Sequence, residues 1–251
     1  MSAPARLEFL APDAAELAGA RRPEPRSPID WVHRAAGARL ANRAGWRLVA
    51  GYGAPEDEAA ARRRAVGICD LSFLGKLELQ GEAAELAAIV AELAGGAELE
   101  PGLATRADGV WWCPVSATRV LAVTPPERTA SVRDAAESAA GAARRYVSVH
   151  ELTTALGSNA VAGPLARECF ARTTALDLRP QHFPERGFAP VSVARTPGMI
   201  LRHHSDLFLH LFGAGYAEYT WTVFTDAAVE LGGRAIGFEA LGLADGGIGD
   251  A

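Results

Sequence analysis

The chain has 251 residues, 49% of them apolar, and a formal net charge of −5, so it is long enough for one large core or two small ones. Its apolar stretches are too short to cross a bilayer and its longest basic run is Arg62–Arg64, so we predict neither a membrane span nor a nucleic-acid partner. The N-terminal residues form no continuous apolar run, which argues against a secretion signal and predicts a cytoplasmic protein.

The first 30 residues contain five prolines among alanines and charges, which predicts an extended or poorly ordered arm over residues 1–30. The folded part is expected to begin near Trp31. Apolar periodicity then predicts the elements of the first half. The expected helices are 28–42, 55–66, 82–93 and 129–143, and the expected strands are 46–52, 76–80, 111–115, 119–124 and 146–152.

One pattern occurs twice, namely a strand that runs through a glycine into a helix. In the first copy, Leu77 and Leu79 alternate with polar residues before Gly81, as in a half-buried strand. In the second copy, strand 159–162 leads through Gly163 into helix 165–174, with a proline at the favourable first helical position. The remaining expected elements are strands at 188–194, 199–203, 206–212 and 234–238 and a helix at 215–231.

Each half therefore has the order β-α-β-β-α-β of a ferredoxin-like unit. We predict an α+β fold of two duplicated halves, 31–152 and 153–251, whose strands face each other or form one layer. The alternative is a chance similarity between two common units.

Residues 64–81 read RAVGICDLSFLGKLELQG, which resembles the "R..aGlfD.S..g...l.G" signature of the glycine-cleavage T-protein family. That family includes aminomethyltransferases, the folate domains of dimethylglycine oxidases and the gamma subunit of heterotetrameric sarcosine oxidase. Three more elements agree in order, and they are 161–164 ("l.GP.a"), 194–196 ("isRt") and 206–209 with 216–221 ("dgfei…a..lW"). The resemblance covers residues 35–243. It implies the T-protein folate-binding fold, with the tetrahydrofolate pterin in a central channel between the two domains.

The chain departs from the family pattern at the positions that carry its chemistry. Residues 108–113 stand where T-proteins have the acidic pair that orients the folate nitrogen and the amine. The pterin-binding glutamate is absent from the stretch containing 196–200, the arginines are absent from 236–243, and the C-terminal barrel domain is missing. These losses argue against aminomethyl transfer and against tetrahydrofolate as a cofactor, because polar groups orient such reactants. The pattern is most similar to the sarcosine oxidase gamma subunit.

Asp70 and Ser72 precede a strand, where they could bind a polar group of a ligand or cap a turn. Trp111 and Trp112 should point to opposite faces of their strand, so that one packs in the core while the other is available to stack on a ligand. Arg195, in the "isRt" element, is a ligand-binding candidate through the resemblance.

Histidines are densest at His203, His204 and His210. Adjacent histidines on a strand face opposite ways and no carboxylate or cysteine completes a ligand set, so we predict no metal site. His203, His204 and Asp70 are the candidates for general acid or base chemistry. No serine or cysteine lies in a motif typical of a nucleophile.

Four further residue types bear on the core. Cys69, Cys113 and Cys169 lack CxxC spacing, so we expect buried thiols rather than a disulfide framework. Lys76 is the only lysine, which we attribute to a GC-rich coding sequence. Trp112 and Met199 are large, which favours a filled channel.

Three functions stay open. The first is a non-catalytic or weakly catalytic subunit that associates with a flavoprotein amine oxidase in one-carbon metabolism. The second is a divergent enzyme that uses the central cavity, either for folate-dependent one-carbon or methyl transfer or for other chemistry on a small molecule. The third is a folate-binding accessory protein of iron-sulfur maintenance, and the absence of that branch's cysteine signature counts against it.

Overall fold

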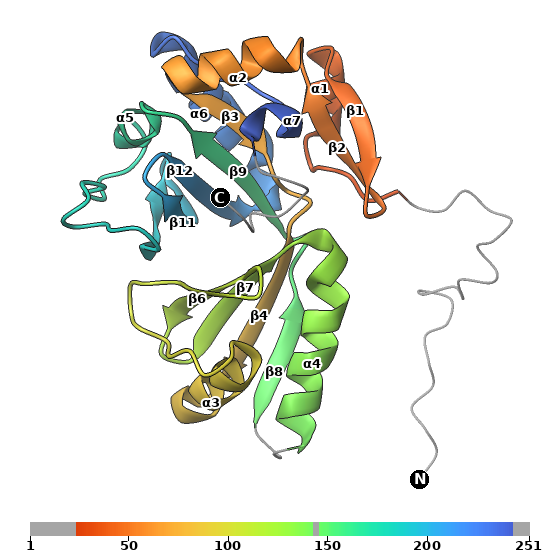
Figure 1. Ribbon diagram of the computed structural model, residues 1–251, viewed down its shortest axis with the longest axis vertical. Helices are drawn as coiled ribbons and strands as arrows, with labels where there is room; N and C mark the ends of the chain where they lie inside the picture. The colour runs from red at the N-terminus through yellow and green to blue at the C-terminus, as the bar shows by residue number, and fades with distance from the viewer. Residues whose placement is uncertain (1–23, 143–145, 243–251) are drawn as a thin grey trace, which may run out of the picture.

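Two antiparallel sheets dominate the computed structural model, which describes residues 24–142 and 146–242 (Figure 1). The five-stranded sheet has the spatial order β5 (Thr105–Ala107), β6 (Val110–Ser116), β7 (Arg119–Thr124), β4 (Gly75–Gly81), β8 (Val147–Glu151). The six-stranded sheet has the order β10 (Phe188–Val193), β11 (Thr196–His204), β12 (Leu207–Gly213), β9 (Leu156–Ala162), β3 (Gly67–Asp70), β13 (Arg234–Ala235). Among the strand pairs within these two sheets, only that of β13 with β3 is parallel. A separate hairpin joins β1 (Arg39–Arg43) to β2 (Trp46–Gly51).

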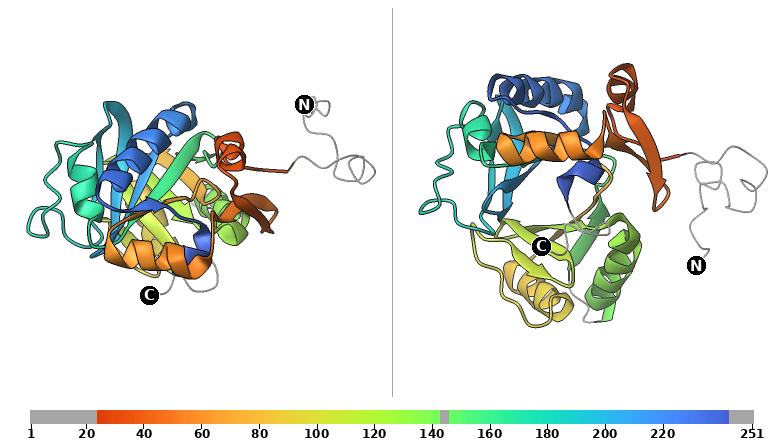
Figure 2. Two further views of the ribbon diagram at one scale, coloured as in Figure 1. Left: turned by 90° about the horizontal axis from the view of Figure 1, so that it is seen from above. Right: turned by 45° about the horizontal axis from the view of Figure 1, so that its top comes forward.

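Helices cover the outer faces of the two sheets, while the inner faces meet (Figure 2). The five-stranded sheet is covered by α3 (Ala83–Leu93) and α4 (Thr129–Ala142). The six-stranded sheet is covered by α5 (Ala166–Ala171) and α6 (Ala217–Glu230). The other helices are α1 (Asp30–Ala35), α2 (Pro55–Arg64) and α7 (Phe238–Leu241), with short 3-10 turns at η3 (Pro126–Arg128) and η4 (Ala214–Tyr216). None of the helices in the described parts of the chain is long and apolar enough to span a membrane.

The predicted α+β class is confirmed, and of the two predicted arrangements the sheets adopt the one in which they face each other. The five-stranded sheet follows the β-α-β-β-α-β order through β4, α3, β6, β7, α4 and β8. In the six-stranded sheet, β3 pairs with β9 and separates it from β13. Strand β3 thus comes from the first predicted half and lies in the sheet of the second. The duplication and the boundary at residues 152 and 153 therefore stay predictions.

Local sequence accounts for the helices whose prediction was accurate. Leu86, Ile89 and Val90 form the buried stripe of α3, at helical spacing. Helix α2 has a proline in its first turn, acids at its start and arginines at its end, as the helix dipole favours.

The two repeated glycines have different structural reasons. At Gly163 the backbone has φ +128°, and a Cβ would lie 2.4 Å from the Arg62 carbonyl oxygen. At Gly81 the strand is extended, but a Cβ would lie 2.7 Å from the Val147 side chain of β8. Both positions exclude larger residues because neighbouring chain segments approach closely.

Two predicted elements were wrong in part. The expected helix 28–42 ends at Ala35, because Gly37 adopts φ +74° and the following residues pair with β2 as strand β1. The expected strand 234–238 contains only Arg234 and Ala235, because Gly237 packs against the Ala50 carbonyl and α7 follows at once.

The described end of the predicted N-terminal arm contacts β2. Arg47 donates its backbone N–H to the Pro25 oxygen at 2.9 Å, and its guanidinium donates to both Asp30 oxygens at 2.9 and 2.8 Å. Residues 1–23 of the arm lie outside the described part.

Candidate functional site

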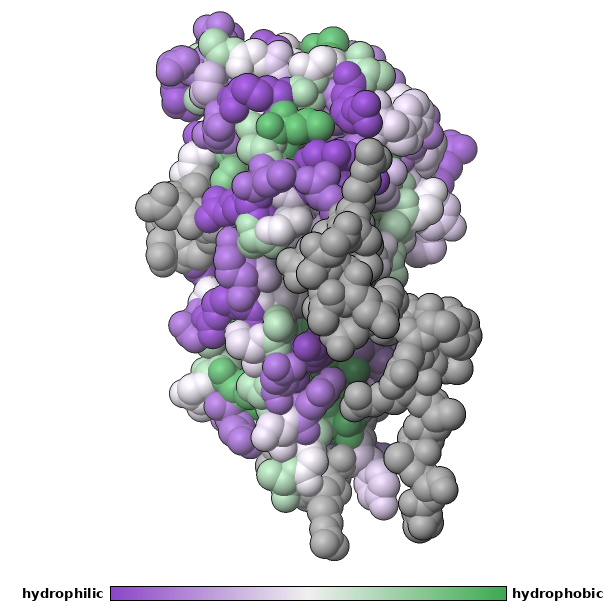
Figure 3. All heavy atoms as spheres, turned by 90° about the vertical axis from the view of Figure 1, so that its right-hand side faces the viewer, coloured by the Kyte–Doolittle hydropathy of each residue, from purple (hydrophilic) through white to green (hydrophobic). Residues whose placement is uncertain are grey.

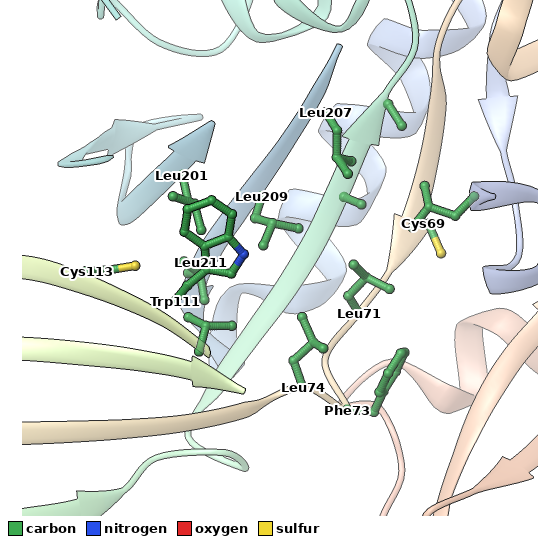
Figure 4. Close-up of a cluster of buried hydrophobic side chains, with 14 of the residues drawn as sticks. Cys69, Leu71, Phe73, Leu74, Trp111, Cys113, Leu201, Leu207, Leu209 and Leu211 are labelled. Carbon is green, nitrogen blue, oxygen red and sulfur yellow. The ribbon is translucent and has the colours of Figure 1, made fainter. Parts of the chain in front are cut away.

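The inner faces of the two sheets meet in an apolar layer (Figure 4). Buried side chains from both sheets and from the link between β3 and β4 form it, including Cys69, Leu71, Phe73, Leu74, Trp111, Cys113, Leu201, Leu207, Leu209 and Leu211. In the close-up, the Trp111 ring lies beside Leu201 and Leu209. This layer is where the family resemblance places the pterin channel.

Lys76 is the main polar group on the inner face of the five-stranded sheet. It lies opposite Val123 of β7, is fully buried, and its Nζ donates to the Ser72 carbonyl oxygen at 2.8 Å. Burial lowers the pKa of this amine to about 7, although the nearby Asp70 carboxylate favours the charged form. We expected polar side chains on β4 to face solvent. That expectation was wrong for Lys76 and Glu78, because the second sheet covers this face.

Asp70 is the centre of a buried hydrogen-bonded chain at the end of β3. Its Oδ2 lies 2.8 Å from His33 Nε2, and His33 Nδ1 lies 2.7 Å from the Tyr52 hydroxyl. A carboxylate only accepts, so His33 Nε2 carries the proton of this hydrogen bond and donates it to Asp70. The other Asp70 oxygen accepts the Ser72 backbone N–H at 2.8 Å, as in a turn cap.

Burial would raise the pKa of Asp70, but hydrogen bonding and the charge of His33 outweigh it and hold that pKa below its usual value. Burial raises the pKa of the Tyr52 hydroxyl, so this group stays protonated. Ser72 Oγ in turn accepts the Ser158 backbone N–H at 3.2 Å and ties the β3–β4 link to β9. These contacts give Asp70 and Ser72 a structural role in holding α1, β3 and β9 together.

The two tryptophans of β6 do point to opposite faces. Trp111 lies in the inner layer, 5.2 Å from the His203 ring centroid and 5.6 Å beneath the Arg106 guanidinium. Trp112 lies in the outer core with α3 and α4, so it does not fill the space between the sheets. The filled layer that we predicted is instead made by Trp111 and its neighbours, with Met199 packed against it.

The predicted histidine group does not converge on one site. A bulge in β11 brings the His203 and His204 rings to 5.2 Å, so the expectation that they face opposite ways was wrong. His210 lies on the outer face, among the rings of Phe170, Phe212 and Phe224. Burial lowers the pKa of His204, and it lowers the pKa of His210 to about 3.

Arg195 is exposed in the turn between β10 and β11, where the backbone has φ +62°. Sequence analysis missed His33, Tyr52 and Asn159. Asn159 pairs in register with both His210 and Asp70, so these three side chains share the outer face of neighbouring strands. No motif marks these residues, because they come together only when α1, β2 and β9 pack.

His210 provides a test of the outer core through pH. Its folded pKa of about 3 lies below the unfolded value near 6.5, so only the unfolded chain binds the proton as the pH falls, and stability is lost from about pH 6.5 downward. We expect His210→Leu to reduce the loss of unfolding free energy between pH 6.5 and 5 by about 2 kcal/mol. Urea denaturation monitored by tryptophan fluorescence measures this. His182 is exposed, so His182→Leu is the matched control. If the unfolding free energy of His210→Leu depended on pH as it does in the unchanged protein, the lowered pKa of His210 would be contradicted.

Two cavities differ in how they relate to these residues. The first, lined by Asp30, His33, Arg47, Asp70 and Ser72 among others, has a volume of about 10 Å³ and holds one water at most. The second is an apolar groove of about 500 Å³ between α3, the β6–β7 turn and β10, and none of the predicted site residues lines it. Within residues 24–142 and 146–242, no cluster of three or more histidine, cysteine or acidic side chains could hold a metal ion.

A pterin does not fit the described inner layer. Its ring nitrogens and oxygen need hydrogen-bond partners when buried, and burial without them costs several kcal/mol. Most of the layer is aliphatic and aromatic, and two of its polar atoms, the Lys76 amine and the buried Trp111 Nε1, only donate, so neither provides an acceptor for the pterin's own N–H groups. At the position of the family's acidic pair, Trp111, Trp112 and Cys113 are all buried. Asp108 is exposed and pairs with Arg128, so it does not reach the layer.

Comparison with known sequences gives one family and short matches to its members. The model of the GCVT N-terminal domain matches residues 29–244. The aminomethyltransferase of Nitrosococcus oceani is 47% identical over 51 residues, which are 20% of this chain and 14% of that protein. The aminomethyltransferase of Streptomyces coelicolor is 40% identical over 62 residues, which are 24% of this chain and 17% of that protein. The matched segments thus span less than a fifth of either relative.

Two solved structures share the fold. The glycine cleavage system aminomethyltransferase T from Bartonella henselae superposes with a TM-score of 0.71 and 16% identity, covering 87% of this chain and 61% of its own. A chain of the heterotetrameric sarcosine oxidase from Corynebacterium sp. U-96 superposes with a TM-score of 0.59 and 21% identity, covering 72% of this chain and 93% of its own. The family model matches residues 29–244, which are most of this chain. The chain therefore belongs to the GCVT N-terminal domain family.

Proposed function

We propose that this protein is a non-catalytic subunit that uses the T-protein fold to associate with a flavin-dependent amine oxidase of one-carbon metabolism. The observation that carries the proposal is the apolar layer between the sheets, which occupies the place where the family would hold a pterin. A subunit that neither binds folate nor orients an amine can lose the polar groups of that site and still keep the fold.

The charged groups near the layer also favour a structural role. Lys76 donates to a backbone carbonyl, and Asp70 is bonded to His33 and to the Ser72 backbone. The cavity beside Asp70 is too small for a substrate larger than water. General acid or base chemistry needs a group within hydrogen-bond reach of a bound reactant, and these side chains have no such space beside them.

The proposed partner follows from the shared fold. The matched chain of the Corynebacterium sarcosine oxidase belongs to a heterotetramer, and the superposition covers 93% of that chain. We therefore propose an analogous assembly, in which a flavoprotein carries the oxidation and this chain is an accessory subunit.

Two measurements on the full chain test this function. We expect the purified protein to show no saturable tetrahydrofolate binding by titration calorimetry, with an aminomethyltransferase as positive control. When it is expressed together with its gene neighbours, we expect it to elute from a sizing column in a complex with a flavoprotein. Saturable folate binding together with turnover of a methylated amine would overturn the proposal in favour of a divergent enzyme.

A further inference from the structure

Four exposed arginines from α2, α5 and β13 lie where these three elements meet. We call them the arginine corner, and they are Arg63, Arg64, Arg167 and Arg234. Two backbone hydrogen bonds join the elements directly after α2. Leu165 donates its N–H to the Ala65 oxygen at 3.0 Å, and Arg234 donates its N–H to the Val66 oxygen at 3.1 Å. The end of α2 and α5 are neighbours in each ribbon view (Figures 1 and 2).

Most of the charge in the arginine corner has no acidic partner. Among the residues that the structure describes, the side chains of Arg63, Arg64 and Arg234 form no ion pair. Arg167 lies 3.4 Å from Glu168, but both side chains are nearly half exposed, so this pair contributes little. The corner therefore presents several uncompensated positive charges to solvent.

Arg62, which precedes the corner in α2, lacks an acidic partner as well. Its Nε is buried and has no hydrogen-bond partner in the described ranges. Burial lowers the pKa of this guanidinium, and the charge of Arg63 lowers it further. The positive charges at the end of α2 thus act on one another without an anion between them.

The helix dipole explains only part of the arginine corner. It favours positive charge at the end of α2, where Arg63 and Arg64 lie. It disfavours Arg167 in the first turn of α5, and it does not act on Arg234, which lies in a strand. Stabilisation of α2 alone therefore does not account for the grouping of all four arginines.

Acidic residues pair with arginines elsewhere on the surface. The chain has 30 Asp and Glu residues and 25 Lys and Arg residues, so acids are not scarce. The side of the molecule that carries β1 and α4 faces the viewer in Figure 3, and hydrophilic side chains are spread over it. There Arg43 lies 3.4 Å from Glu127, and Arg133 lies 2.9 Å from Glu151. The arginine corner differs from this side because three neighbouring arginines share no carboxylate.

The residue types in the corner indicate what it binds. Guanidinium groups hold carboxylates through paired hydrogen bonds. A second copy of the chain is unsuitable, because a two-fold axis through the corner would place arginine against arginine. The exposed aromatic residues of the described ranges lie outside α2, α5 and β13, so the corner has no ring to stack on a nucleic-acid base. These three elements also have no large exposed apolar side chain to insert into a membrane.

We infer that the arginine corner is a docking surface for a protein face rich in aspartate and glutamate. In the assembly proposed above this face belongs to the flavoprotein, so the inference rests on that proposed function and adds where the partner binds. Carboxylates that meet Arg63, Arg64 and Arg234 form charge-assisted hydrogen bonds and reduce the repulsion among the arginines. Because the arginines are exposed, salt screens this attraction and weakens the binding.

Charge reversal in the full chain tests the inference, and the probe is the flavoprotein that co-elutes when the gene neighbours are expressed. We expect Arg63→Glu/Arg234→Glu to bind this flavoprotein at least about tenfold more weakly than the unchanged protein at low salt, as biolayer interferometry measures. Arg34→Glu/Arg186→Glu is the matched control, because it reverses two exposed arginines that form no ion pair with described residues. The control should bind as the unchanged protein does. Arg63→Gln/Arg234→Gln should show a smaller loss, and urea denaturation shows that each variant is folded.

The outcomes separate this inference from the proposed function. If the folded variants of the corner bind the flavoprotein as tightly as the unchanged protein, the inference is overturned and the proposed function stands. If the unchanged protein forms no complex with a flavoprotein, the proposed function is overturned and this inference with it. Binding of duplex DNA or phosphatidylserine vesicles that is lost in Arg63→Glu/Arg234→Glu, with flavoprotein binding unchanged, would assign the corner to a different anion.

Discussion

Replacing Lys76 with methionine should raise the free energy of unfolding at pH 7 by roughly 2 kcal/mol, although it removes a hydrogen bond. Lys76 is fully buried between the sheets, and among the residues that the structure describes its Nζ has one acceptor, the Ser72 carbonyl oxygen. Methionine has a similar length and no charge to desolvate, so it keeps the packing volume and removes the cost of burying the amine.

The stronger test is the pH dependence. The folded pKa of Lys76 is about 7 and the unfolded value is 10.5, so between these values the unfolded chain binds the proton and the folded chain does not. Stability therefore rises with pH across this window, by about 2 kcal/mol between pH 7 and 8.5. Lys76→Met should lose this rise, which urea denaturation at a series of pH values measures.

The comparison must be made between proteins at the same pH, because other groups titrate as well. Burial raises the pKa of the Cys69 and Cys113 thiols, which lowers stability at higher pH in both proteins. Leu77→Met, on the same strand but facing the helices, is the matched control and should keep the wild-type slope. If the unfolding free energy changed equally with pH in Lys76→Met and in the unchanged protein, this amine would not be buried in its neutral form.

Replacing Asp70 with alanine should destabilise the protein by about 3–5 kcal/mol, because it leaves a buried polar chain without its acceptor. Asp70 accepts from His33 at 2.8 Å and from the Ser72 backbone at 2.8 Å. The His33 ring also contacts Trp221 of α6, with ring centroids 4.8 Å apart. Loss of Asp70 therefore loosens α1 from both β3 and α6.

Urea denaturation at pH 7 measures the cost, and a double-mutant cycle with His33→Phe assigns it to the pair. The cost of Asp70→Ala should be much smaller when His33 is already replaced. Asp177→Ala removes an exposed ion pair with Arg179 and, as the matched control, should have far less effect. An equal cost of Asp70→Ala in both backgrounds would contradict the pairing. Because the pKa of Asp70 is lowered on folding, its contribution is present above about pH 4 and is lost as the pH falls further.

Local sequence was sufficient for most helices and strands. The helical period alone predicts the buried stripe of Leu86, Ile89 and Val90, and the two-residue period of a strand alone predicts the alternation around Leu77. The local pattern predicted an element wrongly where a contact with residues distant in sequence determines the secondary structure. Strand β1 forms because β2 is available to pair with it, and β13 is short because Gly237 packs against Ala50.

The candidate site was predicted less well. Asp70 and Ser72 were found because they lie in one short motif, and both prove to be buried. Their partners were not found, since His33 lies in α1 and Tyr52 follows β2, and no spacing connects them with β3. Glu58 is another such case, because its carboxylate accepts the backbone N–H of nearby Gly53 and also that of Gly237, which is 179 residues away in the chain.

The sequence by itself determined the α+β class, the order of most elements and the family, because periodicity and motifs are local properties of the chain. Only the tertiary structure decided which face of each strand is buried. Strand β4 has the alternation of a half-exposed strand, yet a second sheet covers its polar face and encloses Lys76. Burial depends on what packs against a surface, so the filled layer between the sheets becomes visible only in the assembled fold.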